Sequence, residues 1–397
     1  MINLTFDFDK IHDRRNTNSL KWDLFKDRIR AKYGVEDGSD ILPMWVADMD
    51  FAIPEAVVDG IKERLSHPIF GYSYISDECK TAIVNWYERR HNWKIDPESL
   101  LFHSGVVPAI ATVVETFTEP GDLVCASTPV YPYFFNIPKS LKREFVDCPL
   151  ISNENMYEYD FNALEEVFKK GVKAYILCSP HNPGGVVWSK ETLETLVQLC
   201  IKYDVLLISD EIHQDIVFEG YNHIPTLTVK NSEKAKIITL TAPTKTFNLA
   251  GLHAAIIVAP NETLRLKLRQ TKAAHGLDDW NILATAGVQA VYEKGDAWLD
   301  EMISYVSKNI DYLEEQLNQL EGIRVIRPQA SYLVWIDYRE TGIDENEMMD
   351  RLLNKGRLAI EPGTKYGEAG RGYLRINLAC PRSTVEEGIK RFKKALQ

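Results

Sequence analysis

The stretch Val205-Leu206-Leu207-Ile208-Ser209-Asp210-Glu211-Ile212-His213 begins with a continuous apolar run and ends with acidic and imidazole side chains. Similar apolar runs occur at 123–126, 174–178, 237–240 and 255–258. Because they do not alternate with polar residues, these runs predict strands that are covered on both faces of a sheet. Apolar residues at helical spacing separate several of the runs, over 106–117 and 189–203. This alternation predicts a mostly parallel α/β sheet flanked by helices.

The carboxyl-terminal part of the chain has a different pattern. A long helical pattern over 296–320 precedes short apolar runs and two further helical stretches, at 323–326, 332–336, 373–378, 346–355 and 384–396. Strands and helices interleaved in this way predict a smaller α+β domain. We therefore expect a small domain with an N-terminal arm, formed by residues 1–49 and 286–397, and a large domain formed by residues 50–285. The polar, irregular residues 1–45 are expected to pack on the small domain or on a partner subunit.

Composition excludes several classes of protein. The 397 residues include 46 Lys and Arg against 57 Asp and Glu, for a net charge of −11, which disfavours binding to the phosphates of nucleic acids. With 45% hydrophobic and 26% charged residues the chain is typical of a globular protein and not of a disordered one. No apolar run is long enough for a transmembrane helix, and residues 1–7 lack the basic-then-apolar order of a signal peptide.

The six cysteines are scattered, without the spacing of a metal site. Cys178 and Cys200 lie inside apolar segments, where a buried free thiol is the ordinary interpretation. We expect a soluble, cytoplasmic protein without a bound metal or a membrane partner.

Polar residues follow three of the predicted strands at the point where each strand ends. They are His181-Asn182-Pro183 after the run at 174–178, Asp210 with His213 after the run at 205–208, and Thr244-Lys245-Thr246 after the run at 237–240. Ligands of doubly wound sheets bind outside the carboxyl ends of the strands. An amide, a carboxylate with an imidazole, and a lysine are therefore expected at one edge, near the turn Ser104-Gly105 at a predicted helix start, whose free amides suit a phosphate.

That set matches the requirements of pyridoxal phosphate. The cofactor needs a lysine for its Schiff base and a carboxylate that keeps its ring nitrogen protonated, for which Lys245 and Asp210 are candidates. Its phenolic oxygen, ring face and phosphate need further partners, which we assign to Asn182 with His213, to Tyr131, and to Gly105-Val106-Val107. Taken singly, each residue has an ordinary structural explanation as a surface lysine, a turn, a loop aromatic or a core histidine. Their conjunction favours the cofactor site.

The sequence resembles the fold-type-I pyridoxal-phosphate enzymes of the class I/II aminotransferase superfamily, and within it the MalY/PatB branch of cystathionine β-lyases and related carbon–sulfur lyases. The resemblance covers nearly the whole chain. The stretches that carry it include Ser19-Leu20-Lys21-Trp22-Asp23, Pro43-Met44-Trp45-Val46-Ala47-Asp48-Met49-Asp50-Phe51, Phe70-Gly71-Tyr72, Thr128-Pro129-Val130-Tyr131, Ser209-Asp210-Glu211-Ile212-His213, Thr244-Lys245-Thr246-Phe247-Asn248 and Arg375-Ile376-Asn377. The lysine and aspartate motifs are specific to the superfamily, and the tryptophan-rich N-terminal stretches indicate the branch. It implies an aminotransferase-like fold with a large cofactor domain and a smaller α+β domain.

The resemblance also implies roles for individual residues. Lys245 would be the Schiff-base lysine, Asp210 the partner of the ring nitrogen and Asn182 a contact of the phenolic oxygen. Tyr131 would stack on the ring, while Tyr72 would reach the cofactor phosphate of the neighbouring subunit in a homodimer. Both tyrosines are grouped with Lys245 as candidate catalytic residues. The substrate would be bound by Arg375, which suits its α-carboxylate, and by Ala47.

Three positions depart from the pattern of the superfamily. Ala242 stands where relatives often have a serine near the phosphate, and Thr244, a further candidate cofactor contact, replaces the usual serine before the lysine. His253 stands where many aminotransferases have an arginine, so the phosphate site is less cationic than theirs.

The function implied by the resemblance is β-elimination from L-cystathionine or a related cysteine S-conjugate, giving a thiol such as homocysteine, pyruvate and ammonia. An amino-acid aminotransferase would use the same residues, and only the resemblance to the branch favours the lyase. A lyase that also regulates another protein by binding it is a further alternative.

Overall fold

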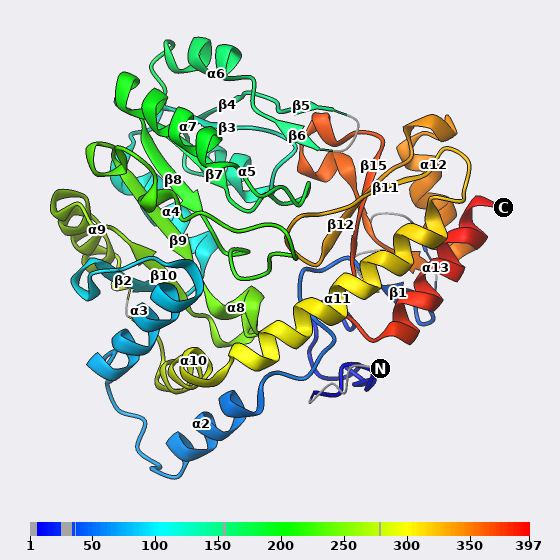
Figure 1. The fold of residues 1–397 in the computed structure, drawn as a ribbon, viewed down its shortest axis with the longest axis horizontal. Coiled ribbons are helices and arrows are strands. Elements are labelled where there is room, and N and C mark those ends of the chain that lie inside the picture. Colours follow the sequence, from blue (N-terminus) through cyan, green and yellow to red (C-terminus); the bar gives the residue numbers. More distant parts are fainter. Residues whose placement is uncertain (1–5, 25–33, 36, 154–155, 278) are drawn as a thin grey trace.

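A seven-stranded sheet organises the larger part of the chain in the computed structural model, which describes residues 6–24, 34–35, 37–153, 156–277 and 279–397 (Figure 1). Its strand order is β2-β10-β9-β8-β7-β3-β4. All neighbours are parallel except β10, which runs antiparallel to both β2 and β9. The strands are β2 Leu100–His103, β3 Leu123–Ala126, β4 Glu144–Asp147, β7 Ala174–Cys178, β8 Leu206–Asp210, β9 Ile237–Thr241 and β10 Ala255–Val258. The predicted mostly parallel sheet is confirmed.

Helices cover both faces of this sheet and explain why its strands are continuously apolar. In β7, Ala174 and Ile176 face the core that contains α4, α5 and α9, whereas Tyr175 and Leu177 face the core that contains α6 and α7. Both sets are buried, as two-sided coverage requires. The helices are α4 Val106–Phe117, α5 Tyr133–Ser140, α6 Phe161–Phe168, α7 Lys190–Tyr203 and α9 Glu262–Ala274.

The predicted start of α7 is also confirmed. The hydroxyl of Ser189 caps the helix by accepting a hydrogen bond from the amide of Thr192 at 3.1 Å. Cys200 on this helix and Cys178 at the end of β7 are buried free thiols, as expected.

The carboxyl-terminal part forms an antiparallel sheet of order β11-β12-β15-β14. The helix α11 runs diagonally from the region of α8 (Pro243–Thr246) and α10 (Ile282–Lys294) toward α13 (Figure 1). The elements are β11 Arg324–Ile326, β12 Leu333–Asp337, β14 Glu361–Pro362, β15 Tyr373–Asn377, α11 Asp296–Leu317, α12 Glu345–Asp350 and α13 Arg382–Leu396. The helix expected at 346–355 continues beyond α12 as a π-helical turn, Arg351–Gly356. Two small pairs complete the strands: β1 Leu42–Pro43 with β13 Leu358–Ala359, and β5 Ile151–Ser152 with β6 Tyr157–Glu158.

Seven α-helices of the described residues were not anticipated: α2 Glu55–Leu65, α3 Asp77–His91, α8 Pro243–Thr246 and α10 Ile282–Lys294, together with α5, α6 and α9. Helix α10 packs against both α2 and α3. The expected domain boundary at residue 286 falls inside α10, and the division into two domains remains a prediction. Among the described residues, no helix combines the length and apolar composition needed to cross a bilayer.

Part of the N-terminal arm packs on the body of the chain. The ring of Phe8 lies 5.0 Å from that of Phe51 and 5.6 Å from that of Trp298 on α11, as judged between ring centroids. Residues 1–5, 25–33 and 36 of the arm lie outside the described residues.

Candidate active site

Three polar segments meet at the carboxyl edge of the large sheet. Strand register places Cys178 of β7 beside Asp210 of β8, and Asp210 beside Leu240 of β9. The segments that hold Asn182, Asp210 and Lys245 therefore leave neighbouring strands at the same edge, as the sequence predicts.

Lys245 lies on the short helix α8, directly after β9. Its Nζ donates a hydrogen bond to the carbonyl oxygen of Ala47 at 2.6 Å. The hydroxyl of Tyr332 donates to the same oxygen at 3.1 Å. Burial lowers the pKa of Lys245 to about 8, although the nearby carboxylates of Asp48 and Asp210 oppose the shift. The amine is therefore partly uncharged near neutral pH, as a nucleophile or proton acceptor must be.

Asp210 ends β8 and is buried. Burial raises its pKa to about 7, and the hydrogen bond that Oδ1 accepts from the amide of Ile212 at 3.1 Å only partly offsets the shift. A buried carboxyl group with so raised a pKa is stabilised by a cationic or hydrogen-donating partner.

Arg375 projects from β15 to the same edge and is buried. Its Nη1 donates to Oδ1 of Asn182 at 3.1 Å, and Nη2 donates to the carbonyl oxygen of Trp45 at 2.8 Å. The guanidinium carbon lies 4.9 Å from the ring centroid of Tyr366, a cation–π contact. Nε has no hydrogen-bond partner among the described residues. The guanidinium is thus oriented and still has a donor available.

His213 and Tyr131 also belong to this cluster. Burial lowers the pKa of His213 to about 3, and the charges of Lys245 and Arg375 add to the effect, so the imidazole is neutral. Its Nδ1 has no partner within the described part of the chain. Burial raises the pKa of Tyr131 to about 12, and both Arg375 and Asp210 act on it electrostatically. The structure therefore brings both residues to the site.

The segment Gly105-Val106-Val107 forms the start of α4, which follows β2. Because β2 and β9 both run antiparallel to β10, the start of α4 lies at the same edge of the sheet as Lys245. No side chain caps this end of α4 within the described residues. Its first amides can therefore bind an anion, aided by the helix dipole. Thr244 lies beside Lys245 on α8, and Ala242 is buried just before that helix.

Two of the residues singled out in the sequence are exposed. Tyr72 is fully exposed, in the loop between α2 and α3. His253 is exposed too, with a left-handed backbone conformation (φ 54°).

A family model for aminotransferase class I and II matches residues 39–392. The chain belongs to this family. The predicted aminotransferase-like fold and superfamily are thereby confirmed.

Relatives in this family are similar to the chain over its whole length. It is 41% identical to cystathionine beta-lyase PatB of Bacillus subtilis (strain 168), over 98% of this chain and 99% of that protein. A PLP-bound putative aminotransferase from Clostridium difficile 630 superposes with a TM-score of 0.94 at 38% identity, covering 99% of this chain and 100% of that one. A PLP-bound C-S lyase from Staphylococcus hominis superposes with a TM-score of 0.90 at 34% identity, covering 99% of each chain. The resemblance to the PatB branch is confirmed.

The residues at the sheet edge of this family member fit pyridoxal phosphate. The buried carboxyl of Asp210 has a raised pKa, and two buried atoms, Nδ1 of His213 and Nε of Arg375, have no hydrogen-bond partner among the described residues. A protonated ring nitrogen can pair with the carboxyl of Asp210, and oxygen atoms of the cofactor or of an amino acid can accept a hydrogen bond from Nε of Arg375. The uncharged fraction of the Lys245 amine is the form that can react with the aldehyde of the cofactor.

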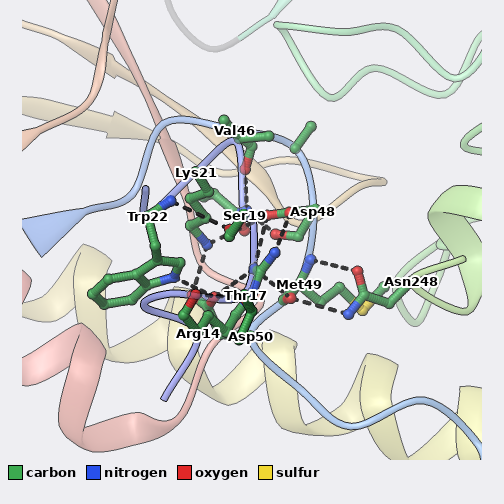
Figure 2. Close-up of polar contacts among 12 residues, drawn as sticks. Arg14, Thr17, Ser19, Lys21, Trp22, Val46, Asp48, Met49, Asp50 and Asn248 are labelled. Carbon is green, nitrogen blue, oxygen red and sulfur yellow. Dashed lines mark hydrogen bonds and ion pairs between the residues drawn. The ribbon is translucent and has the colours of Figure 1, made fainter. Parts of the chain in front are cut away.

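Sequence reasoning missed several residues that complete the site. Tyr332, at the start of a predicted strand, gave no signal beyond its apolar surroundings. Asn377 lies two positions after Arg375 on β15, and its side chain donates to the carbonyl oxygens of Val46 and Asp48, at 2.6 Å each. The spacing of two places Arg375 and Asn377 on one face of the strand, a signal that could have identified Asn377. Figure 2 shows the polar contacts around the segment that contains Val46, Asp48 and Met49.

Proposed function

We propose that this protein is a pyridoxal-phosphate-dependent carbon–sulfur β-lyase that cleaves L-cystathionine or related cysteine S-conjugates. The observation that carries the proposal is the 41% identity to cystathionine beta-lyase PatB over essentially the full length of both chains. Lysine and aspartate alone would not distinguish a lyase from an aminotransferase, because both reactions need them.

Lys245 is the group that moves the proton in the proposed reaction. When bound, pyridoxal phosphate supplies an aldehyde carbon that reacts with amines and a ring that accepts the electron pair left on the substrate Cα. The Lys245 amine would hold the cofactor and, once the substrate amine has replaced it there, take the proton from Cα. Its pKa of about 8 suits a base that works near neutral pH.

Asp210 would keep the ring of the cofactor electron-accepting. We assign its carboxylate as the group that pairs with the protonated ring nitrogen. In the buried position at the end of β8, the ion pair would be screened little by water.

Arg375 would bind the α-carboxylate of the amino acid. Contacts with Asn182 and Trp45 orient its guanidinium, and Nε remains available as a donor. We assign Tyr131 to the face of the ring, and Ala47 to the wall of the substrate site. Asn182 and His213 are assigned to the phenolic oxygen, and Thr244 with the start of α4 to the phosphate.

The proposed outcome is breakage of the bond between the β-carbon and sulfur. From cystathionine the thiol released is homocysteine, and water converts the remaining three-carbon unit to pyruvate and ammonia. The test is to incubate the purified protein separately with L-cystathionine, L-cystine and L-alanine. Pyruvate and thiol from the sulfur substrates alone support the lyase. Transfer of the amino group to an added keto acid, without thiol release, would instead identify an aminotransferase.

We also propose that the active unit is a homodimer to which Tyr72 contributes. The loop around it exposes several large apolar side chains: Leu65, Ile69, Phe70, Tyr72 and Tyr74. Such a patch is typical of a protein interface. Figure 1 shows α2 and this loop at the periphery of the chain, where a second copy has access.

Mixing two inactive variants tests this arrangement. Tyr72→Phe removes the hydroxyl proposed to reach the neighbouring site, and Lys245→Ala removes the lysine. If sites are shared, unfolding and refolding the two together restores activity, because some mixed dimers contain one intact site. Tyr74→Phe is the matched control and is expected to be active alone. Without restoration, Tyr72 does not act across subunits.

We place the protein in the cytoplasm. All six cysteines are buried free thiols, which fits a reducing compartment. Fractionation of cells that produce the protein tests this placement.

A further inference from the structure

The loop of residues 45–49 is held by side chains along its whole length. Each of its five carbonyl oxygens accepts at least one side-chain hydrogen bond. The donors include two groups of the proposed catalytic cluster, Lys245 on Ala47 and Arg375 on Trp45. The position of this loop therefore affects both the amine and the guanidinium.

The other side of the loop is held by a buried ionic cluster from the N-terminal arm (Figure 2). The guanidinium of Arg14 donates to both oxygens of Asp48, at 3.2 and 2.6 Å, and to Oδ1 of Asp50 at 2.8 Å. Nζ of Lys21 donates to Oδ2 of Asp50 at 2.6 Å and lies 3.7 Å from Asp48. Nε1 of Trp22 donates to Oδ1 of Asp50 at 3.1 Å. Arm and loop are thus joined by two cations and two carboxylates.

The ionic cluster is largely buried, unlike a surface ion pair. The side chain of Lys21 is only 1% exposed and that of Asp50 8%. Burial opposes the ionised form of Asp50, but Lys21 and Arg14 outweigh it and lower the pKa of the carboxyl. Removal of one partner from such a cluster leaves an unpaired buried charge, which strongly destabilises the arrangement.

Arg14 also binds the loop itself. Its Nη1 donates to the carbonyl oxygen of Met49 at 3.1 Å, an atom that the side chain of Asn248 also contacts at 3.0 Å. Asn248 in turn lies three residues after Lys245 on the same segment. The cluster is therefore connected to the lysine segment through Met49 as well as through Ala47.

We propose that Arg14 and Lys21 are positioning residues, which bind Asp48 and Asp50 and so hold the loop 45–49 where Ala47 accepts a hydrogen bond from Lys245 and Trp45 accepts one from Arg375. The proposal rests on the function proposed above for Lys245 and Arg375. Docking of the arm and the state of the catalytic amine are thereby coupled. An arm that is not docked leaves the amine without its acceptor.

The charged and titratable groups that act on the Lys245 amine are Asp48, Asp210, Arg375 and His213. Release of the loop removes the carbonyl of Ala47 and moves Asp48 away, and both changes favour the uncharged amine. It also admits water, which weakens the burial that lowers the pKa of Lys245 and so favours the charged amine. The pKa of Lys245 should therefore change when the cluster is broken.

The test compares Lys21→Met and Arg14→Met with Arg15→Met. Arg15 is the matched control, because it adjoins Arg14, is 61% exposed and pairs with Asp13, outside the cluster. Two properties are measured on each protein after removal of pyridoxal phosphate. One is amide hydrogen exchange of peptides that cover residues 44–51, and the other is the pH profile of the rate at which added pyridoxal phosphate binds, followed by absorbance.

In both cluster variants we expect exchange in residues 44–51 to be faster by about tenfold, and the midpoint of the pH profile to shift by about 0.5 units, relative to Arg15→Met. Arg14→Lys, which retains the charge, should recover part of both effects. If Lys21→Met does not fold, Arg14→Met, whose side chain is 23% exposed, provides the same comparison.

Two results would overturn the proposal. The first is that Lys21→Met and Arg14→Met have the same hydrogen exchange in residues 44–51 and the same pH midpoint as Arg15→Met, even if they are thermally less stable. The other is faster exchange with an unchanged midpoint, since the cluster would then stabilise the loop without acting on Lys245. Both readouts are independent of carbon–sulfur cleavage, so they remain informative if the wild-type protein releases no thiol.

Discussion

The Nζ of Lys245 lies 2.6 Å from the carbonyl oxygen of Ala47, although 198 positions separate the two residues in the chain. The lysine follows a strand of the large sheet, whereas Ala47 belongs to a loop that Asn377 of the small sheet also binds. The position of the amine therefore depends on both the large sheet and the loop that the small sheet binds, and its chemistry requires that the two are correctly assembled. This relationship leads to tests of the lysine and of the residues that surround it.

Replacement of the lysine should abolish the reaction. We expect Lys245→Ala to lower kcat by at least about 10³-fold, because the variant lacks the amine that is assigned to take the Cα proton. Borohydride reduction of the wild-type protein loaded with pyridoxal phosphate should attach the cofactor to this residue, as peptide mass spectrometry would show. Lys236→Ala removes a half-exposed lysine that pairs with Asp204, and serves as the control. Labelling of any other side chain in the wild type would contradict the assignment.

Asp210 should make the stability of the cofactor-free protein depend on pH. Its pKa is about 7 in the folded protein, against 3.8 for an exposed aspartate, so between these two pH values the folded state binds a proton that the unfolded state has lost. The stabilising effect of that proton is fully present below about pH 4 and is lost as the pH rises through 7. Asp210→Asn does not titrate, so from pH 4 to 7 its free energy of unfolding should rise relative to wild type, by on the order of 4 kcal/mol at most.

Urea denaturation at a series of pH values measures this difference. Glu368→Gln, a substitution on an exposed carboxylate, controls for general charge effects. Equal pH dependence in wild type and Asp210→Asn would show that the buried carboxyl does not titrate as described. Saturation with pyridoxal phosphate should stabilise wild type more than the variant, because the ring nitrogen then pairs with the carboxylate.

The sheet edge was predictable because strands that are buried on both faces have a strong sequence signal. The runs at 123–126, 174–178 and 255–258 coincide with β3, β7 and β10, and the polar residues after the runs mark the strand ends. Asp210 and Lys245 follow from that pattern and from the chemistry of the cofactor. These inferences need only local sequence.

The loop 45–49 and its partners could not be predicted in this way. Their contacts are backbone carbonyls bound by distant side chains, such as Tyr332 on Ala47, and any residue can supply a carbonyl. Helices α2 and α10, which pack against each other, were also missed, although Val57, Ile61 and Leu65 of α2 recur at helical spacing. The role of Tyr72 likewise cannot be derived from one chain, because its side chain is exposed and contacts no other proposed site residue in the described part of that chain.

Substitution of Arg375 should affect substrate binding more than the chemical step. In Arg375→Lys the charge remains, but the forked contacts with Asn182 and Trp45 cannot both be made. We expect KM to rise by about 10- to 100-fold, with a smaller change in kcat. Arg371→Lys is the matched control, because Arg371 is 61% exposed and pairs with Glu368. A change in kcat alone would exclude carboxylate binding as the main role of Arg375.

Removal of one hydroxyl tests whether the Ala47 carbonyl positions the lysine. Tyr332→Phe deletes the donor that lies 3.1 Å from that oxygen and leaves the buried ring in place. A lost hydrogen bond of about 1 kcal/mol should lower kcat/KM by about fivefold. The control is Tyr338→Phe, since the hydroxyl of Tyr338 is buried without a hydrogen-bond partner among the described residues and its loss should cost nothing. If both variants have the activity of wild type, the carbonyl of Ala47 holds the Lys245 amine without help from Tyr332; if both lose activity equally, the effect is one of packing.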